Sequence, residues 1–263
     1  PMKAYYLFLA ALLSASAFAA DYPVRPIRIV IGFTPGGTPD ITARLIGVKL
    51  FESLGQQIVV DNRPGAGGTI GAKLVAEASP DGHTLLSVSA SHVLQPSIYA
   101  KLPYDTVRDF AGITRTSTAC YLLVTSPSSE ARSAKELIAQ ARARPGQLNF
   151  ASAGSGSGTH FAGEMLKHAA GIDVVHVPYK GIPESLNDTI AGRVQFFLSP
   201  LSGAIPLVKG GKLRALGVSC ATRVAAIPEV PTLADTVLPG FRFDTWSGIL
   251  APVRTPRAII LKL

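Results

Sequence analysis

Two glycine-rich turns constrain the fold of this 263-residue chain more than any other feature. The first glycine loop, residues 33–40 (Phe-Thr-Pro-Gly-Gly-Thr-Pro-Asp), follows the apolar stretch 27–33, and the second glycine loop, residues 152–160, follows a strand candidate at 147–151. Each loop leads directly into a segment whose apolar residues have helical spacing. A strand, a loop of small residues and a helix N-terminus present unpaired N–H groups and the positive end of a helix dipole, which can receive an anion. Two such units in one chain predict a ligand held between two domains.

The N-terminus is typical of an exported protein. Lys3 precedes an apolar run over residues 4–13 and a small-residue stretch that ends at Ala20. This pattern predicts a signal peptide over residues 1–20 with cleavage near Ala19 or Ala20. A membrane anchor is the alternative, but the apolar run is too short to span a bilayer comfortably.

Composition indicates a compact globular protein and argues against nucleic-acid binding. Apolar residues make up 47% of the chain and charged residues 16%. The net charge is +8, but the basic residues are scattered singly rather than gathered in runs with interleaved aromatic residues. We interpret the basic character as a solvated surface that steers anions weakly.

Candidate strands and helices alternate along the chain. Strands are predicted at 27–33, 57–60, 84–88, 111–124, 147–151, 174–178, 194–198, 213–219 and 246–250, and helices at 40–54, 69–78, 133–144, 160–170, 184–191 and 203–209. Strands separated by single helices predict parallel α/β sheets with helices on both faces.

Two segments are candidates for crossing between domains. The apolar stretch 111–124 is too long for one strand of ordinary length, and 213–221 is a second candidate. With two crossings, residues 21–117 and 222–263 form lobe 1 and residues 118–221 form lobe 2. Ligands in such folds bind outside the carboxyl ends of the strands, where both glycine loops lie.

Catalytic and cofactor motifs are weak. Neither glycine loop fits a dinucleotide fingerprint, a P-loop or a nucleophile elbow, and the histidines lack zinc-ligand spacing, so we expect no cofactor and no metal. The alternative is an exported hydrolase or transferase that uses Ser157, His160 and an aspartate. A serine and a histidine three residues apart on one loop rarely reach nucleophile–base geometry, which disfavours this alternative.

Several linked motifs identify a family resemblance. They are Tyr22-Pro-Val-Arg-Pro-Ile-Arg28, the first glycine loop, Val60-Asp-Asn-Arg-Pro-Gly-Ala-Gly-Gly-Thr-Ile-Gly71, Pro80-Asp-Gly-His-Thr-Leu-Leu86, the second glycine loop with His160, Val175-His-Val-Pro-Tyr-Lys-Gly181, Gly211-Lys-Leu-Arg-Ala-Leu216 and Val230-Pro-Thr-Leu233. The chain resembles the Bug family of periplasmic solute-binding proteins, the receptors of tripartite tricarboxylate transporters. The resemblance implies a Venus-flytrap fold, with two doubly wound α/β lobes joined by a two-strand hinge. It also implies a monomeric periplasmic receptor that captures a small organic carboxylate, delivers it to membrane components of the transporter and performs no catalysis.

The resemblance places the two glycine loops around the ligand carboxylate, which backbone N–H groups and bridging water would hold. Neither loop contains Lys or Arg, which agrees with that mode of binding. The candidate ligand-binding residues are Phe33, Thr34, Gly36, Gly37, Asp40, Ser89, Ser91, Ser152, Gly154, Gly156, Ser157, Gly158, Thr159, His160 and Tyr179.

Some of these residues have structural alternatives. Each hydroxyl can instead form a helix cap or a turn bond. Asp40 either stabilises the helix that starts beside it or receives an ammonium or hydroxyl group of the ligand. His160 is expected to order its loop, and Tyr179 either walls the cleft or packs.

The chain departs from the family pattern in three places. Thr34 stands where members often carry proline, and residues 198–202 lack the Asp-Asn often found there. The sequence also stops at Leu263, inside an expected helix, so we expect the family's C-terminal helices, which would cover lobe 1, to be absent from this chain.

The two cysteines each lie in a candidate crossing segment. Cys120 and Cys220 are separated by 100 residues in the sequence. Neighbouring strands bring Cα atoms to within roughly 4.5–5.5 Å, which is inside disulfide range. The sequence therefore allows a disulfide between them, with two unpaired buried thiols as the alternative.

Overall fold

The computed structural model describes residues 22–263, so the predicted signal peptide lies outside the described residues. The strands are β1 (Ile27–Ile31), β2 (Ile58–Asn62), β3 (Thr84–Ser89), β4 (Phe110–Thr125), β5 (Asn149–Ser152), β6 (Val175–Pro178), β7 (Phe196–Pro200), β8 (Arg214–Val218) and β9 (Asp244–Pro252). The helices are α2 (Thr38–Leu54), α3 (Thr69–Ala76), α4 (Ser91–Leu94), α5 (Ala134–Ala143), α6 (Gly158–Ala170), α7 (Ile182–Ile190), α8 (Leu201–Lys209), α9 (Leu233–Thr236) and α10 (Arg257–Lys262), with short 3₁₀ turns at Ala66–Gly68 and Gln95–Ser97.

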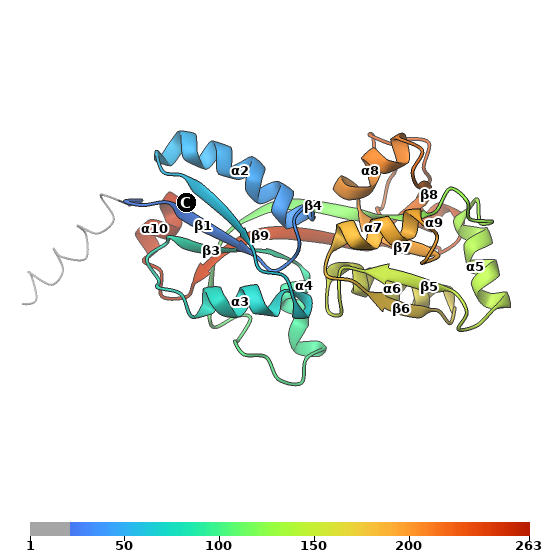
Figure 1. Ribbon diagram of the computed structural model, residues 1–263, viewed down its shortest axis with the longest axis horizontal. Helices are drawn as coiled ribbons and strands as arrows, with labels where there is room; N and C mark the ends of the chain where they lie inside the picture. Colours follow the sequence, from blue (N-terminus) through green and yellow to red (C-terminus); the bar gives the residue numbers. More distant parts are fainter. Residues whose placement is uncertain (1–21) are drawn as a thin grey trace, which may run out of the picture.

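The strands form one long sheet with two halves. Its order is β2-β1-β3-β9-β4-β7-β5-β6, and β8 pairs with β4 beside that path. The first half carries β1, β2 and β3 with α2 and α3 on opposite faces, and the second half carries β5 to β8 with α5 to α9 (Figure 1). The two-lobed α/β architecture expected for a Venus-flytrap fold is confirmed.

The sheet is mixed, whereas the sequence predicted parallel pairing. Within each half the pairs β1–β2, β1–β3, β5–β6 and β5–β7 are parallel. The two long strands β4 and β9 run antiparallel to each other and to their neighbours. Each of these two strands follows an irregular segment rather than a crossover helix, and antiparallel pairing needs no crossover helix.

β4 connects the two halves, as its length predicts. Its residues from Phe110 to Cys120 pair with β9, and those from Tyr121 to Thr125 pair with β7 or β8. The register of β4 shifts twice along β9, which adds curvature where the halves meet. In Figure 1 the two strands run through the middle of the molecule between the halves.

The chain returns to the first half later than we expected. The predicted second crossing contains β8, which pairs only with the second-half part of β4. The residues that follow stay in the second half, because Leu233, Leu238 and Phe241 are buried in its core. The strand that returns is β9, so the hinge of the structure is the β4–β9 pair.

Apolar side chains buried between the sheet and its helices form the core of both halves. The alternate residues Ile27, Ile29 and Ile31 of β1 are fully buried on one face, and Val30 is fully buried on the other. Helices cover both faces of this strand, and four of its five residues are accordingly apolar. In the second half, Phe150, Phe196 and Leu166 occupy the equivalent position between sheet and helix.

A disulfide joins Cys120 of β4 to Cys220, which follows β8. The two Cα atoms are 5.3 Å apart, within the range expected from the sequence. The bond therefore links the strand that leaves the first half to the segment that precedes the return.

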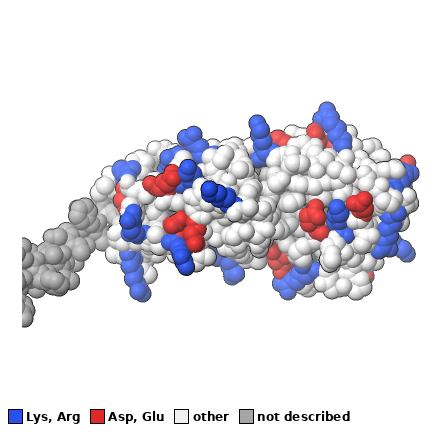
Figure 2. All heavy atoms as spheres, turned by 90° about the horizontal axis from the view of Figure 1, so that it is seen from below, with Lys and Arg blue, Asp and Glu red and all other residues white. Residues whose placement is uncertain are grey.

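The surface of the described residues is mixed in charge and partly apolar. On the face drawn in Figure 2, basic and acidic side chains are interspersed. On α2, Leu45, Val48 and Phe51 are each more than half exposed. Among residues 22–263, no helix combines the length and the apolar character needed to cross a membrane.

Candidate functional site

Both glycine loops line one pocket between the two halves of the sheet. The pocket contains about 460 Å³ of empty space, part of it open to solvent. Its lining residues are Phe33, Gly37, Thr38, Pro39, Ser89, Tyr121, Ala153, Ser157, Gly158, Thr159, Ile182, Pro200, Thr245 and Ser247. Residues from the first half, the second half and the β4–β9 hinge all contribute, so the pocket exists only when the halves are close together.

Four helices begin at this pocket. Gly37 is the N-cap of α2 and Ser157 is the N-cap of α6, while Ile182 is the first residue of α7 and Pro200 is the N-cap of α8. The first N–H groups of a helix have no partner within it, and the dipole is positive at that end. Four helix N-termini therefore lie at the pocket, two of them at the ends of the glycine loops.

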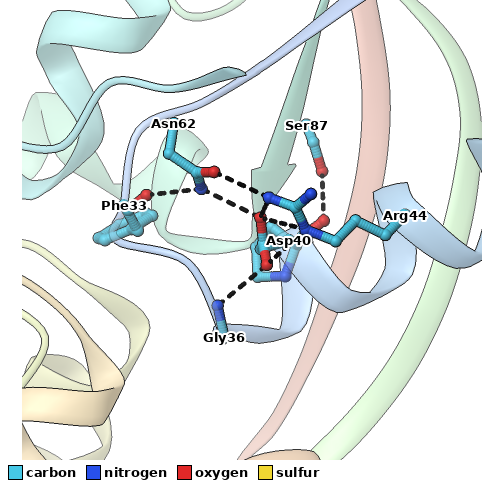
Figure 3. Close-up of polar contacts among 7 residues, drawn as sticks. Phe33, Gly36, Asp40, Arg44, Asn62 and Ser87 are labelled. Carbon is cyan, nitrogen blue, oxygen red and sulfur yellow. Dashed lines mark hydrogen bonds and ion pairs between the residues drawn. The ribbon is translucent and has the colours of Figure 1, made fainter. Parts of the chain in front are cut away.

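The first glycine loop is held by the buried carboxylate of Asp40 (Figure 3). One carboxylate oxygen accepts a hydrogen bond from the Gly36 N–H at 2.9 Å, and the other accepts from Arg44 at 3.0 Å and from Asn62 at 3.1 Å. Asn62 also donates to the carbonyl of Phe33 at 3.0 Å. A single cluster thus joins both ends of the loop to the start of α2.

The same contacts decide the role of Asp40. Burial on its own raises the pKa of this carboxyl, but hydrogen bonds from Arg44, Gly36 and Asn62 outweigh burial, so the pKa lies below its usual value. The side chain is only 3% exposed and does not line the pocket. Asp40 therefore joins the loop to the start of α2; the structural role weighed from the sequence was stabilisation of that helix.

The second glycine loop is held by hydroxyl groups. The Ser157 hydroxyl accepts from the backbone N–H of His160 at 3.2 Å and lies 2.9 Å from the Thr159 hydroxyl. The Thr159 hydroxyl accepts from the Ala153 N–H at 2.8 Å. These bonds cap α6 and fold the loop back on itself, so the cap role that we considered for Ser157 is present.

Two stacked imidazoles lie behind the second glycine loop. The rings of His160 and His176 are 4.0 Å apart between centroids, and His160 Nδ1 accepts from the Gly156 N–H at 3.2 Å. His176 Nε2 lies 2.6 Å from the Ser152 hydroxyl. Burial, and then the neighbouring His160, lower the pKa of His176 to about 4, and burial also lowers the pKa of His160. Both rings are therefore neutral at pH 7, and His160 orders the loop as expected.

The hinge strands supply the rest of the pocket wall. Tyr121 of β4, and Thr245 and Ser247 of β9, bring three hydroxyl groups that are almost fully buried. Burial raises the pKa of Tyr121 to about 12, an effect that the nearby Thr245 hydroxyl partly offsets. The Thr245 Oγ1 atom nevertheless has no partner in hydrogen-bond geometry among the described residues. We call these three residues the hinge hydroxyls.

The predicted site residues divide into two groups. Those that line the pocket are Phe33, Gly37, Ser89, Ser157, Gly158 and Thr159. The others lie around it: Thr34, Gly36, Asp40, Ser91, Ser152, Gly154, Gly156, His160 and Tyr179. The Tyr179 hydroxyl, for example, donates to Asp188 at 2.7 Å and its ring packs against the second-half core, so it does not wall the pocket.

Eight lining residues were not predicted from the sequence. They are Thr38, Pro39, Tyr121, Ala153, Ile182, Pro200, Thr245 and Ser247. Thr38 and Pro39 belong to the first glycine loop and Ala153 to the second, but none of the three was singled out as a ligand-binding residue. The hinge hydroxyls carry no local signal, because they are single polar residues within strands.

At two positions of the loops, glycine is favoured over larger residues for a conformational or a steric reason. Gly36 has a φ of +94°, in the region that other residues rarely adopt. A side chain at Gly158 would place its Cβ atom 2.5 Å from the Tyr121 hydroxyl. A larger residue at the start of α6 would therefore displace a wall of the pocket.

Hydrogen bonds connect the two halves beside the pocket. Thr34 donates to Glu184 at 3.2 Å, and the hydroxyls of Thr38 and Ser202 are 3.1 Å apart. The Tyr99 hydroxyl donates to the Ser155 carbonyl at 3.0 Å. The structure therefore represents a closed arrangement of the two halves.

The geometry does not support the hydrolase alternative. The Ser157 hydroxyl bonds the backbone N–H of His160, not its imidazole. The imidazole Nδ1 accepts a backbone N–H, and its Nε2 lies 3.9 Å from Glu164 on the same helix. Neither ring nitrogen is placed to take a proton from the serine.

Comparisons with known proteins agree with this geometry. The sequence model of the protein family described as the tripartite tricarboxylate transporter family receptor matches residues 42–263. Protein BugT of Bordetella pertussis is 36% identical over 259 residues, which cover 97% of this chain and 79% of BugT. The structure of R. palustris Rpa4515 with adipate is 34% identical with a TM-score of 0.88, covering 91% of this chain and 80% of that one. MatC from Rhodopseudomonas palustris with bound malate is 32% identical, again with a TM-score of 0.88, covering 92% and 82%.

Proposed function

The chain belongs to the family of tripartite tricarboxylate transporter receptors, and on that premise we propose that it is an exported receptor for a small organic carboxylate. The ligand carboxylate binds between the two glycine loops, and the two halves close on it by bending at β4 and β9. The receptor then delivers the ligand to the membrane components of a tripartite transporter. Proteins of this family are solute-binding receptors, so the chain is not an enzyme.

The observation that carries this proposal is the meeting of both glycine loops in one pocket. Gly37 and Ser157, the N-caps of α2 and α6, both line it and come from different halves of the sheet. Backbone N–H groups and helix dipoles bind a carboxylate without a charged side chain. The adipate and malate of the two related structures support a carboxylate as the ligand. The N-terminal sequence pattern and the periplasmic relatives support export.

The proposal is tested first with a thermal-shift screen of carboxylates on the mature chain. A ligand that binds the folded state raises the melting temperature, and the rise grows with the ratio of the ligand concentration to its Kd. We expect at least one small carboxylate to raise the melting temperature and the matching uncharged amide to have no effect.

The variant Gly37→Val then locates the site. Gly37 has φ −77° and ψ 163°, which any residue adopts, and an added Cβ would lie 3.4 Å from the nearest atom of Ile182, an ordinary contact. The side chain should therefore enter the pocket without straining the loop and weaken binding at least tenfold by calorimetry. Gly112→Val in β4 is the matched control, because an added Cβ there meets no atom within 4 Å and Gly112 does not line the pocket. Equal affinity in both variants would place the site elsewhere.

A further inference from the structure

One contact between the two halves lies outside the ligand pocket and joins Tyr99 of the first half to the second glycine loop. The Tyr99 hydroxyl donates a hydrogen bond to the Ser155 carbonyl at 3.0 Å. Neither residue lines the pocket, whereas Ser157, two residues after Ser155, does. Tyr99 therefore contacts the ligand-binding loop at a residue that does not itself line the pocket.

The backbones of the two halves also approach closely beside Tyr99. A Cβ atom added at Gly67, in the 3₁₀ turn between β2 and α3, would overlap the Ser155 carbonyl oxygen and lie 2.9 Å from the Tyr99 hydroxyl. A Cβ atom added at Gly156 would lie 3.0 Å from the Tyr99 ring. Because glycine at both positions has no side chain, the second glycine loop can seat against the first half. We call Gly67, Tyr99, Ser155 and Gly156 the latch.

The first-half part of the latch is fixed within its own half. The side chain of Gln95, which is almost fully buried, donates to the Gly67 carbonyl at 2.9 Å. The Gln95 carbonyl accepts from the Tyr99 N–H at 2.9 Å. Gln95 therefore holds Gly67 and Tyr99 in place relative to each other. Burial raises the pKa of the Tyr99 hydroxyl, so this group stays protonated and can donate its hydrogen bond at pH 7.

The second-half part of the latch is tied to the pocket. The Ser157 N–H donates to the Gly154 carbonyl at 3.0 Å, and the Gly156 N–H donates to His160 Nδ1 at 3.2 Å. These bonds join residues 155 and 156 to Ser157, the N-cap of α6, which lines the pocket. A movement of the latch residues therefore displaces the helix start at which the ligand carboxylate is proposed to bind.

We propose that the latch holds the two halves closed around the ligand and sets how slowly the ligand leaves, without touching it. This inference rests on the proposed function. The ligand enters while the halves are apart and the latch is open, so the latch does not affect association. The ligand leaves only after the latch has opened, so each latch contact slows dissociation. Tyr99 is a positioning residue, because it acts on the ligand through the second glycine loop.

The first test measures both rates for the variant Tyr99→Phe. Stopped-flow fluorescence of Trp246, in the hinge strand β9, follows binding of malate or adipate to the mature chain, and calorimetry gives the Kd. Tyr99→Phe removes only the hydroxyl. Loss of one hydrogen bond that water can reach should raise the dissociation rate about threefold. The association rate should stay as it is in the natural chain.

The variant Gly67→Ala tests the close backbone approach. Its methyl group would meet the Ser155 carbonyl when the halves close, so it should prevent full closure and raise the dissociation rate about tenfold or more. Gly55→Ala is the matched control. The φ of Gly55 is +70°, close to the +62° of Gly67, so both variants carry similar backbone strain. An added Cβ at Gly55 meets no atom of the described residues within 4 Å, so this variant should release the ligand as slowly as the natural chain.

The outcomes separate the latch from the receptor proposal. Dissociation that is equally slow in Tyr99→Phe, Gly67→Ala and the natural chain overturns the latch and leaves the receptor proposal standing. Slower association with unchanged dissociation also overturns the latch, because that pattern belongs to residues that shape the open receptor. If neither malate, adipate nor any other carboxylate of the screen binds the natural chain, the receptor proposal fails and the latch inference fails with it.

Discussion

The two glycine loops face the same pocket but are held in place by different chemistry. The first is braced by an ionised cluster, in which the buried carboxylate of Asp40 binds Arg44, Asn62 and the Gly36 N–H. The second is braced by neutral groups, the Ser157 and Thr159 hydroxyls and a stacked pair of histidines. Both arrangements use polar side chains to position backbone N–H groups, so the shared feature is the exposed helix start and not the supporting residues.

The difference predicts that the loops respond differently to change. An ionised cluster depends on a complete set of partners, because removing one leaves a charge buried and unpaired. Hydroxyl caps are weaker individually, at about 1 kcal/mol each. The first loop should therefore be the more sensitive to mutation, and the second the more sensitive to mild acid.

The largest expected effect concerns the hinge, which both loops share. Replacing Cys120 and Cys220 with alanine removes a crosslink across 100 residues, which the chain-entropy model values at about 4–5 kcal/mol. We expect the free energy of unfolding to fall by this amount in urea. Unfolding can be followed by the fluorescence of Trp246, the single tryptophan of the chain, which lies in the hinge strand β9.

Loss of the disulfide should lower the stability of both halves together. It should leave unchanged the difference between the two glycine loops in their sensitivity to mutation and to acid. Two alkylatable thiols per chain in unreduced, denatured protein, or unchanged stability in the double variant, would contradict the bond.

Removing the carboxylate of the first loop should have the next largest effect. Asp40→Ala leaves Arg44, Asn62 and the Gly36 N–H without their acceptor and should cost about 2–3 kcal/mol in urea unfolding. Ser157→Ala, the matching change in the second loop, should cost only about 1 kcal/mol, since it removes one cap. Asp40→Asn keeps the size of the side chain and should fall between them. Equal losses in Asp40→Ala and Ser157→Ala would remove the proposed contrast.

Mild acid should act on the second loop first. The pKa of His176 is lowered to about 4 in the folded state, by burial and then by His160. The unfolded chain therefore binds a proton near its ordinary pKa of about 6.5 while the folded chain does not, so stability falls as the pH drops from about 6.5 to about 4. Because the pKa of the Asp40 carboxyl lies below its usual value, the stability that this carboxylate contributes is lost only below about pH 3.8.

The matching variant is His176→Gln. Between pH 7.5 and pH 4.5, its free energy of unfolding in urea should fall by about 1–2 kcal/mol less than that of the natural chain. This figure includes the solvent screening of a half-buried group. An identical pH dependence in the two proteins would show that this histidine pair does not set the acid response.

Much of the fold could be predicted from the sequence because its signals are local. Glycine and proline interrupt the apolar periodicity, so the starts and ends of most strands and helices fall within a few residues of the prediction. The meeting of the two glycine loops could be predicted because each loop follows the carboxyl end of a strand, where ligands bind in α/β folds. In the structure β1 and β5 run in opposite directions, so the two halves turn these carboxyl ends toward each other.

The features that the sequence did not predict depend on distant contacts. β8 has the length and apolar character of a crossing strand, and only the burial of Leu233, Leu238 and Phe241 in the second-half core shows that the chain crosses later. The hinge hydroxyls are single polar residues in strands, and the register of β4 on β9 brings them to the pocket. The support by Asp40 also needs Asn62, which lies 22 residues away.

The central claim is that N–H groups of both loops receive one carboxylate, and backbone amide NMR tests it most directly. Titration of the mature chain with the tightest carboxylate from the screen should shift the amide signals of Thr38, at the start of α2, and Gly158, at the start of α6, with the same midpoint concentration. The signal of Gly112, outside the pocket, should stay in place. A shift at only one of the two helix starts, or two shifts with different midpoints, would contradict a single carboxylate held by both loops.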